Sequence, residues 1–344
     1  MALQQATSPL EVMAVLKAGA YGLGARRIAE ALIDAGAQRL AVADLHEALE
    51  LKTHAVPILI LGDLIPEEVP VAITEGFELP VGSFEKAELI SSYALEQDRR
   101  VKIHLVIDTG MGRLGIPLNQ ALEEIKRMKA LPNLEFSGIY SHFPVAYTDR
   151  DFSMSQIAGF KQLLIDLEDE SLKFEWIHIA NSDGIQNISE ACMKPFNLVR
   201  TGLNLYGCFD LEGERRIDLE EILTLKSRLV RVRTLAAGTT LGYGRSYELR
   251  EDQRVGTVAI GYADGFPMSE EAGVLVNGKF CKVLGRVSMD YITIDLSEVE
   301  DACSGDEVLC LGEGISVADW AKWKGTLTYE IICSLGKRVK RLYK

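Results

Sequence analysis

The feature that most constrains the fold is a regular alternation of two sequence patterns between residues 12 and 207. Short apolar runs rich in β-type residues indicate buried strands, and the longer amphipathic segments between them indicate helices. The expected strands are 12–17, 39–44, 57–62, 77–81, 101–107, 135–141, 176–180 and 198–206. The expected helices include 25–35, 45–52, 84–93, 119–128 and 152–168. Eight such strands, alternating with helices, predict a (β/α)8 TIM barrel.

The main alternative for this alternation is a doubly wound parallel sheet. Such a fold is expected to carry a glycine-rich phosphate-binding turn of the form G-x-G-x-x-G after its first strand. The turn that follows the first expected strand contains Gly22-Leu23-Gly24 but does not extend to that motif. The barrel is therefore the favoured interpretation.

The pattern changes near residue 215. The later β-runs are short, alternating and bounded by turns, and little helix is expected before Val317. These runs are 224–233, 254–260, 273–276, 281–284, 291–296 and 307–311. The chain is therefore expected to consist of a barrel domain, residues 1–215, followed by a smaller C-terminal all-β domain, residues 216–344.

Composition excludes several classes of function. The net charge of −13 argues against nucleic acid or an anionic membrane as a general partner. The longest apolar run, 55–62, is too short to span a bilayer, and no signal-peptide pattern opens the chain. The six cysteines show neither C-x-x-C nor zinc-site spacing, which predicts reduced thiols, no metal site and a cytoplasmic location.

Barrel enzymes carry their chemistry at the C-terminal ends of the strands. Lys17 leaves the first expected strand there, and a glycine-rich turn containing Tyr21 follows it. A lysine in that position is well placed for carbonyl chemistry. The other strand ends carry Asp44, Asp63, Asp108–Arg113, Ser141-His142, Asn181-Ser182 and Arg200–Gly202. Any one of these could be a strand-end cap, but together they predict a site on one rim.

Nine motifs in order resemble those of alanine racemase, a family of fold-type III enzymes that use pyridoxal phosphate (PLP). The first, Lys17-Ala-Gly-Ala-Tyr-Gly-Leu-Gly, is similar to the family's K-A-N-A-Y-G-H-G. The others are Asp108-Thr-Gly-Met-Gly-Arg-Leu-Gly, Ser141-His-Phe, His178-Ile-Ala-Asn-Ser, Arg200-Thr-Gly-Leu-Asn-Leu-Tyr-Gly, Gly242-Tyr-Gly, Gly261-Tyr-Ala-Asp-Gly, Gly285-Arg-Val-Ser-Met-Asp and Thr328-Tyr-Glu-Ile. They cover nearly the whole chain.

The resemblance implies racemisation of L- and D-alanine by two acid/base groups on opposite faces of the substrate. It implies that Lys17 holds PLP as a Schiff base and acts on one face, while PLP spreads the negative charge left on the substrate carbon. The second group corresponds to Tyr243, contributed by the partner subunit. The expected assembly is thus a homodimer with shared active sites, supplying D-alanine for peptidoglycan.

The resemblance also assigns residues around the cofactor. Arg200 faces the pyridine nitrogen, where a permanently charged guanidinium does not give up a proton, and His178 orients it. His142 lies against the ring, and Arg113 contacts the phenolic oxygen and the substrate carboxylate. The phosphate is assigned to Tyr21, Ser182, Gly202, the backbone of Leu203, and Tyr329. Met289, from the partner subunit, is assigned a place near the substrate carboxylate, and Tyr262 and Arg286 are assigned to the entrance.

Four features depart from the family pattern. Gly19 and Leu23 stand where the family has Asn and His, which is expected to loosen the turn after Lys17. Val106 replaces a lysine that is often modified to a carbamate and braces the arginine equivalent to Arg113. Only 16 residues precede Lys17, fewer than usual, so the family's first strand is expected to be absent.

Two other functions stay open at this point. A serine racemase of the same fold tends to have a smaller polar residue at the position of Tyr329, so the tyrosine favours alanine. A PLP-binding protein without racemase activity would not need the C-terminal β domain or Tyr243, although the departures at Gly19, Leu23 and Val106 are compatible with it.

Overall fold

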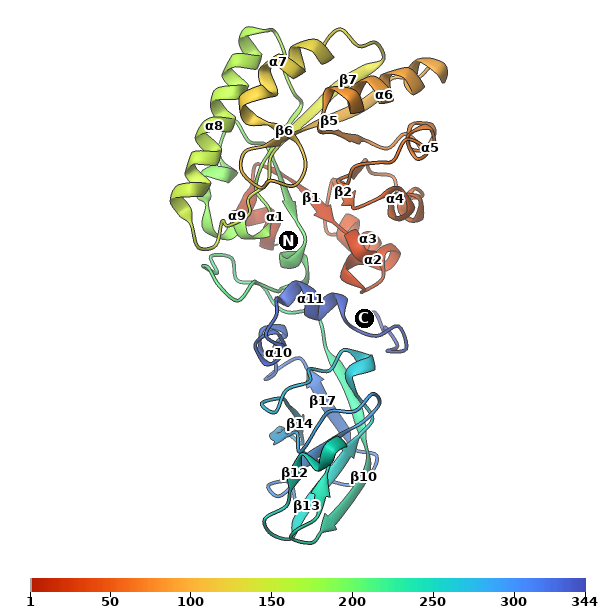
Figure 1. Ribbon diagram of the computed structural model, residues 1–344, viewed down its shortest axis with the longest axis vertical. Helices are drawn as coiled ribbons and strands as arrows, with labels where there is room; N and C mark the ends of the chain where they lie inside the picture. Colours follow the sequence, from red (N-terminus) through yellow and green to blue (C-terminus); the bar gives the residue numbers. More distant parts are fainter. Residues whose placement is uncertain (1) are drawn as a thin grey trace. The chain divides into compact units, whose positions relative to one another are not determined.

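The computed structural model describes residues 2–344, which divide into two compact units. The first contains the chain up to Leu205 together with Glu212–Leu219, and the second contains Tyr206–Leu211 together with Glu220–Lys344 (Figure 1). The chain therefore passes between the units more than once around residues 205–220. The division of roles between residues 1–215 and 216–344 stays a prediction.

The first unit is a parallel barrel, as the sequence predicts. Its eight main strands are hydrogen-bonded in the order β3-β2-β1-β9-β8-β7-β5-β4, and a parallel bridge between Leu59 and Glu78 joins the two edges. A short strand, β6 (Ile116–Pro117), pairs with β5. The main strands are β1 (Glu11–Val15), β2 (Arg39–Val42), β3 (Ile58–Ile60), β4 (Leu79–Val81), β5 (Val101–Asp108), β7 (Leu134–Tyr140), β8 (Trp176–His178) and β9 (Leu198–Thr201).

Helices follow the strands and cover the outside of the barrel (Figure 1). Four begin where a side chain caps the free N–H groups of the first turn, and in one of these Asn181 accepts a hydrogen bond from Gly184 N at 2.8 Å. Asp44 accepts a hydrogen bond from Glu47 N at 2.9 Å, Ser83 from Lys86 N at 3.2 Å, and Asp149 from Phe152 N at 2.9 Å. The helices are α1 (Ala2–Thr7), α3 (Ala25–Asp34), α4 (Leu45–Leu51), α5 (Val69–Glu75), α6 (Phe84–Glu96), α7 (Leu118–Met128), α8 (Arg150–Asp169) and α9 (Ser182–Asn187).

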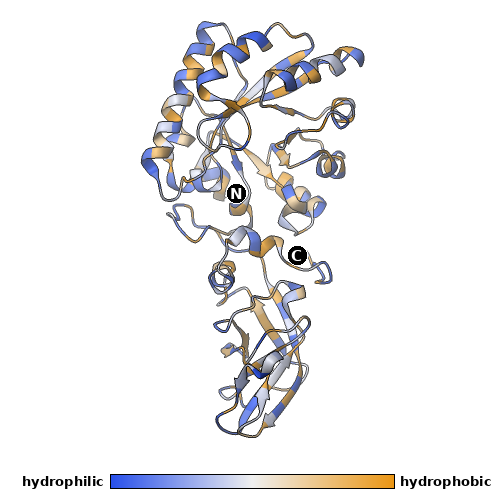
Figure 2. Cartoon of the chain, in the orientation of Figure 1, coloured by the Kyte–Doolittle hydropathy of each residue, from blue (hydrophilic) through white to orange (hydrophobic). Residues whose placement is uncertain are grey.

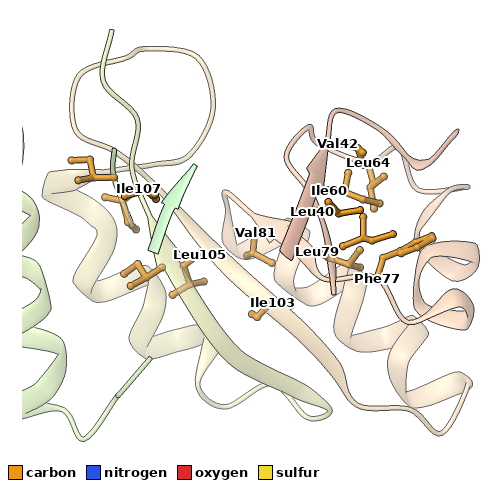
Figure 3. Packing of buried hydrophobic residues seen from close by; sticks show 14 of the residues in the cluster. Leu40, Val42, Ile60, Leu64, Phe77, Leu79, Val81, Ile103, Leu105 and Ile107 are labelled. Carbon is orange, nitrogen blue, oxygen red and sulfur yellow. The ribbon is translucent and has the colours of Figure 1, made fainter. Parts of the chain in front are cut away.

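The barrel strands are buried on both faces, which explains why they form continuous apolar runs in the sequence. In β1, Met13 and Val15 belong to an inner cluster with Leu59 and Leu198. Val12 and Ala14 belong to the larger core beneath the helices. Figure 3 shows this larger core between β2, β3, β4 and β5, and Figure 2 shows apolar strands beside helices that are banded with polar residues.

The second unit is an antiparallel β structure, again as predicted. Its six-stranded sheet has the order β15-β14-β17-β10-β13-β16, and a bridge between Val283 and Ile294 links the outer segments. Trp320 is fully buried beside Phe266, and its Nε1 donates to the Cys310 carbonyl at 2.9 Å. The elements are β10 (Leu225–Leu235), β11 (Thr240–Leu241), β12 (Tyr247–Glu248), β13 (Gln253–Val258), β14 (Gly273–Val276), β15 (Lys279–Lys282), β16 (Ile292–Asp295), β17 (Glu307–Leu311), α10 (Val317–Lys324) and α11 (Thr328–Cys333).

Candidate active site

Lys17 starts a left-handed turn at the C-terminal end of β1. The strand ends at Val15, two residues before the predicted limit, and α2 (Lys17–Tyr21) has φ values of 55°, 62°, 55° and 57° at residues 18 to 21. Left-handed backbone costs an L-residue roughly 1–2 kcal/mol, so this segment stores strain beside the predicted catalytic lysine. Gly19 is the one position in that run where such a φ carries no side-chain penalty.

Glu47 anchors this turn, although no motif in the sequence marks it. Its Oε1 accepts a hydrogen bond from Gly19 N at 3.2 Å, and its Oε2 accepts one from Ala43 N at 2.8 Å. Leu23, where the family pattern has histidine, is buried at the end of the turn. The turn after Lys17 is thus fixed by a carboxylate from α4 and by apolar packing.

The guanidinium of Arg200, in β9, donates hydrogen bonds to imidazole nitrogens and a backbone carbonyl inside the barrel. Its Nη1 donates to His178 Nδ1 at 2.6 Å, and its Nη2 donates to the Ser141 carbonyl at 2.7 Å and to His142 Nδ1 at 3.2 Å. The guanidinium carbon lies 4.8 Å from the centre of the Tyr140 ring. Burial lowers the pKa of Arg200 to about 10, which leaves it charged at neutral pH. His178 therefore contacts Arg200 as the resemblance implies.

His142 shows that four predicted residues share one end of the barrel. Burial, together with the positive charges of Arg200, Arg113 and Lys17, lowers its pKa to about 3. These charges act on His142 because they converge around it at the C-terminal ends of the strands. His142 is therefore neutral at physiological pH, with Nδ1 facing Arg200.

A carboxylate organises the loop that carries Arg113. Asp108 Oδ1, at the end of β5, accepts hydrogen bonds from Gly110 N at 2.9 Å and Met111 N at 2.8 Å, and Gly112 N contacts both of its oxygens. Because three successive N–H groups bind one side chain, the loop has little freedom before Arg113. This carboxylate fixes the loop without a group at position 106.

Val106 itself is buried at the edge of a small cavity of about 90 Å³. Leu114 and Gly115 also line this cavity, together with an ion pair of 3.0 Å between Lys86 and Asp63. Asp63, one of the polar strand-end residues, is thus the ion-pair partner of a lysine in α6. A valine here offers no polar contact to Arg113.

The residues predicted to bind phosphate within the barrel meet just beyond the ends of β8 and β9. Ser182 Oγ accepts a hydrogen bond from Gly202 N at 3.1 Å. A Cβ atom placed on Gly202 would lie 2.0 Å from the Tyr21 hydroxyl, so only glycine leaves that hydroxyl in place. Leu203 is buried and begins the short turn η2 (Leu203–Tyr206). Two hydroxyl groups and a backbone without side chain suit an anionic ligand.

The second unit presents its predicted residues on glycine-supported turns. Tyr243 is 72% exposed and starts η3 (Tyr243–Arg245), with Gly242 and Gly244 at φ of 72° and 75°. A Cβ atom on Gly242 would lie 2.6 Å from Arg286 N, so this turn packs directly on the segment that carries Arg286. Tyr329 lies in α11 and is half-buried.

Tyr262 and Met289 lie on adjacent segments of the second unit. Tyr262, in η4 (Tyr262–Asp264), donates from its backbone N to the Ser288 carbonyl at 3.0 Å, and the side chains of Tyr262 and Met289 are exposed. Arg338 fixes these segments, although its role was not among the sequence-based expectations. It donates to Asp264 at 2.6 and 2.9 Å, to Asp290 at 2.6 Å and to the Met289 carbonyl at 3.2 Å. The sequence signal that could have drawn attention to Arg338 is the basic run at residues 337–341.

Within residues 2–344, no group of His, Cys, Asp and Glu side chains has an arrangement suited to a metal ion. None of the helices in the same range combines the length and the apolar character that a membrane span requires.

The fold is a parallel barrel with a lysine at a strand end, followed by an antiparallel β unit. This combination is shared with a known protein family. Residues 1–210 match the family model for the alanine racemase N-terminal domain, and residues 222–343 match that for the C-terminal domain. The chain is 38% identical over 342 residues to the alanine racemase of Desulforamulus reducens, covering 97% of this chain and 92% of that protein. The chain belongs to the alanine racemase family.

Solved structures agree. The alanine racemase of Clostridium difficile 630 matches with a TM-score of 0.94 at 30% identity, covering 100% of this chain and 91% of that one. The alanine racemase of Bacillus anthracis with bound L-Ala-P matches with a TM-score of 0.87 at 31% identity, covering 98% and 91%.

Proposed function

We propose that this protein interconverts L-alanine and D-alanine with PLP as cofactor. The observation that carries the proposal is the convergence of Lys17, Arg113, His142 and Arg200 at the C-terminal end of a barrel of this family. The names of the relatives, and the L-Ala-P bound to the B. anthracis enzyme, favour alanine over serine.

The residues of the barrel fit PLP. Lys17 would hold the cofactor, and Tyr21, Ser182, Gly202 and the Leu203 backbone would bind its phosphate where the Tyr21 hydroxyl packs on Gly202. Bound there, PLP supplies an electron sink that makes the alanine Cα proton removable. The phosphate role of Tyr329 rests on the family motif alone.

The charged residues have separate tasks in this proposal. Arg200, oriented by His178, would place a permanent charge toward the pyridine nitrogen of a bound cofactor. Arg113, at the end of the loop that Asp108 fixes, binds the substrate carboxylate. His142, kept neutral by burial, packs against the cofactor ring and adds no charge to it.

Lys17 and Tyr243 exchange the proton of alanine on opposite faces of Cα. One removes it and the other returns a proton, which inverts the centre. Tyr243 acts on the site of the partner subunit in a homodimer. Its 72% exposure, together with the 51% exposure of Met289 and the 43% exposure of Tyr262, supports a surface that a second copy covers.

The product would supply D-alanine for peptidoglycan. A cytoplasmic location, predicted from the cysteine pattern, fits that use and stays a prediction.

The test is α-proton exchange of L-alanine in deuterium oxide with PLP added, followed by chiral analysis. The native protein should exchange the proton and invert the centre. Lys17→Ala should lose both exchange and the visible absorption of lysine-bound cofactor. Tyr243→Phe should retain that absorption but lose inversion by a factor of roughly 10²–10⁴, the usual contribution of one acid/base group. Native protein that binds PLP without exchanging the proton would be a cofactor binder, and the proposal would fail.

A further inference from the structure

A continuous chain of buried polar side chains crosses the barrel interior behind Arg200. From Arg200 it passes to His178 in β8, to His104 in β5 and to Glu78, just before β4. His178 Nε2 lies 3.1 Å from His104 Nδ1, and His104 Nε2 lies 3.0 Å from Glu78 Oε2. The same Glu78 oxygen accepts a hydrogen bond from Arg39, at the start of β2. All five side chains are less than a tenth exposed.

The two ends of the chain fix the direction of every hydrogen bond in it. An arginine can only donate, so His178 Nδ1 must accept from Arg200 and carries no proton. Its proton is then on Nε2, which donates to His104 Nδ1. His104 in turn carries its proton on Nε2 and donates to the carboxylate of Glu78. One arrangement of protons satisfies all three contacts.

The ionisation of these groups agrees with this arrangement. Arg39 and His104 hold the pKa of Glu78 down at about 2 despite its burial, so it is a carboxylate and accepts only. Burial lowers the pKa of His104 and of His178, so both rings are neutral. Because Arg200 occupies Nδ1 of His178, the proton of His178 is on Nε2. A doubly protonated His104 would place its own Nδ1–H against that N–H.

The fold leaves room for this series of hydrogen-bonded side chains. Gly138 in β7 lies opposite His104 in the strand register, and a Cβ atom there would lie 2.1 Å from His104 Nδ1. Tyr140, two residues on, stacks on His178 at 4.9 Å between ring centres. Glu78 and Arg39 stand at the N-terminal ends of their strands, which in barrels usually serve stability rather than chemistry.

We propose that Glu78 and His104 are positioning residues that lock His178 in one tautomer and thereby hold Arg200 as a fixed donor toward the cofactor ring. This inference rests on the proposed function for its effect on the reaction. The proton arrangement itself does not depend on that function, because it concerns only residues of this chain.

The test observes the tautomers directly by nitrogen-15 NMR of histidine-labelled protein. The chain has only five histidines, at 46, 54, 104, 142 and 178, and single variants assign the signals. We expect His104 and His178 to be protonated on Nε2 and bare on Nδ1, with and without PLP. A proton on Nδ1 of either ring would overturn the proposal, whether or not the protein racemises alanine.

Two substitutions at Glu78 then connect the tautomer to the reaction. Glu78→Met removes the acceptor, whereas Glu78→Gln retains an oxygen of similar position. In the Met variant we expect His178 to populate both tautomers. With Arg200 less fixed, transfer of the alanine amino group to PLP, which leaves pyruvate, competes with return of the proton to Cα. We therefore expect pyruvate formed per D-alanine to rise about tenfold. The Gln variant should fall between the Met variant and the native protein. A Met variant with native histidine signals and a native pyruvate ratio would overturn the proposal.

Discussion

Arg200 and Tyr243 are both expected to act on one reacting centre, yet their surroundings differ. Arg200 is 4% exposed and held by imidazole and carbonyl acceptors inside the barrel, whereas Tyr243 is 72% exposed on a turn between two glycines. The barrel therefore fixes its half of the site within one chain. The β unit fixes the backbone on either side of Tyr243 and leaves that side chain exposed.

Mixing of inactive subunits tests most directly whether Tyr243 acts in the site of the partner subunit. Lys17→Ala and Tyr243→Phe should each be nearly inactive alone. If Tyr243 serves the partner's site, mixing them should restore about a quarter of native activity, because half of the dimers are mixed and each mixed dimer has one intact site. Racemase activity after subunit exchange is the measurement. Mixing Lys17→Ala with Arg113→Ala, two barrel variants, is the control and should restore none.

A complementation that fails although subunits demonstrably exchange would show that both residues act within one chain. Tyr247→Phe, at a nearby exposed tyrosine, should behave as the native protein.

Acid should weaken the barrel before it weakens the β unit. All five histidines precede residue 179. Because the folded pKa of His142 is about 3 against an ordinary 6.5, the unfolded chain binds the extra proton between these values. Stability from this group is therefore complete above pH 6.5 and falls with pH, by about 2 kcal/mol at pH 5. His104 and His178 act in the same direction.

Hydrogen exchange at pH 5 and pH 7, analysed on peptides from each unit, measures this difference. Barrel peptides should lose protection at pH 5 beyond the intrinsic change in exchange rate, and peptides of the second unit should not. His142→Gln should reduce the effect. Equal loss in both units would contradict the assignment of the buried histidines.

Arg338 tests whether the β unit needs its backbone fixed. Arg338→Ala removes the donors to Asp264, Asp290 and the Met289 carbonyl. We expect KM for alanine to rise roughly three- to tenfold with a smaller change in kcat, since these charge-assisted contacts are half-exposed. Steady-state kinetics in both directions provide the measurement, with Lys337→Ala as the neighbouring exposed control. An unchanged KM would show that the segments hold their position without it.

Gly19 should give the smallest effect. A Cβ atom there would meet no heavy atom within 4 Å, and its φ of 62° is one that asparagine tolerates. Gly19→Asn, which restores the family residue, should change the free energy of unfolding by less than about 1 kcal/mol, whereas Gly19→Val should cost about 1–2 kcal/mol. Urea denaturation measures both. A large loss for Asn alone would mean that the turn cannot accept the family's residue.

Both fold units were predictable because their strands are marked locally. The barrel strands carry dense apolar runs, and the strands of the second unit alternate between short turns. Two short helices, α5 with seven residues and α9 with six, were not among the helices named from the sequence, because such short segments show little periodicity. The strand predicted to include Lys17 ended early because a left-handed turn leaves no clear signature in side-chain types.

Site residues that lie in sequence motifs were predictable, whereas residues brought together only by strand pairing were not. Glu78 and His104 lie within expected strands, where a polar residue gives no sign of its partner. Their contact depends on the pairing of β4 with β5, which sets Leu79 beside Ile103 and cannot be read from either strand alone. Glu47 was likewise hidden in the first turn of a helix.

The bridge between Leu59 and Glu78 gives one residue two tasks. The backbone of Glu78 joins β3 to β4, donating to the Ile58 carbonyl at 3.0 Å and accepting from Ile60 N at 3.1 Å, while its side chain anchors His104. A barrel open at this seam would separate Glu78 from Arg39, its partner in β2, although β4 would still pair with β5. Closure of the ring thus brings the buried carboxylate of Glu78 to the guanidinium that balances its charge.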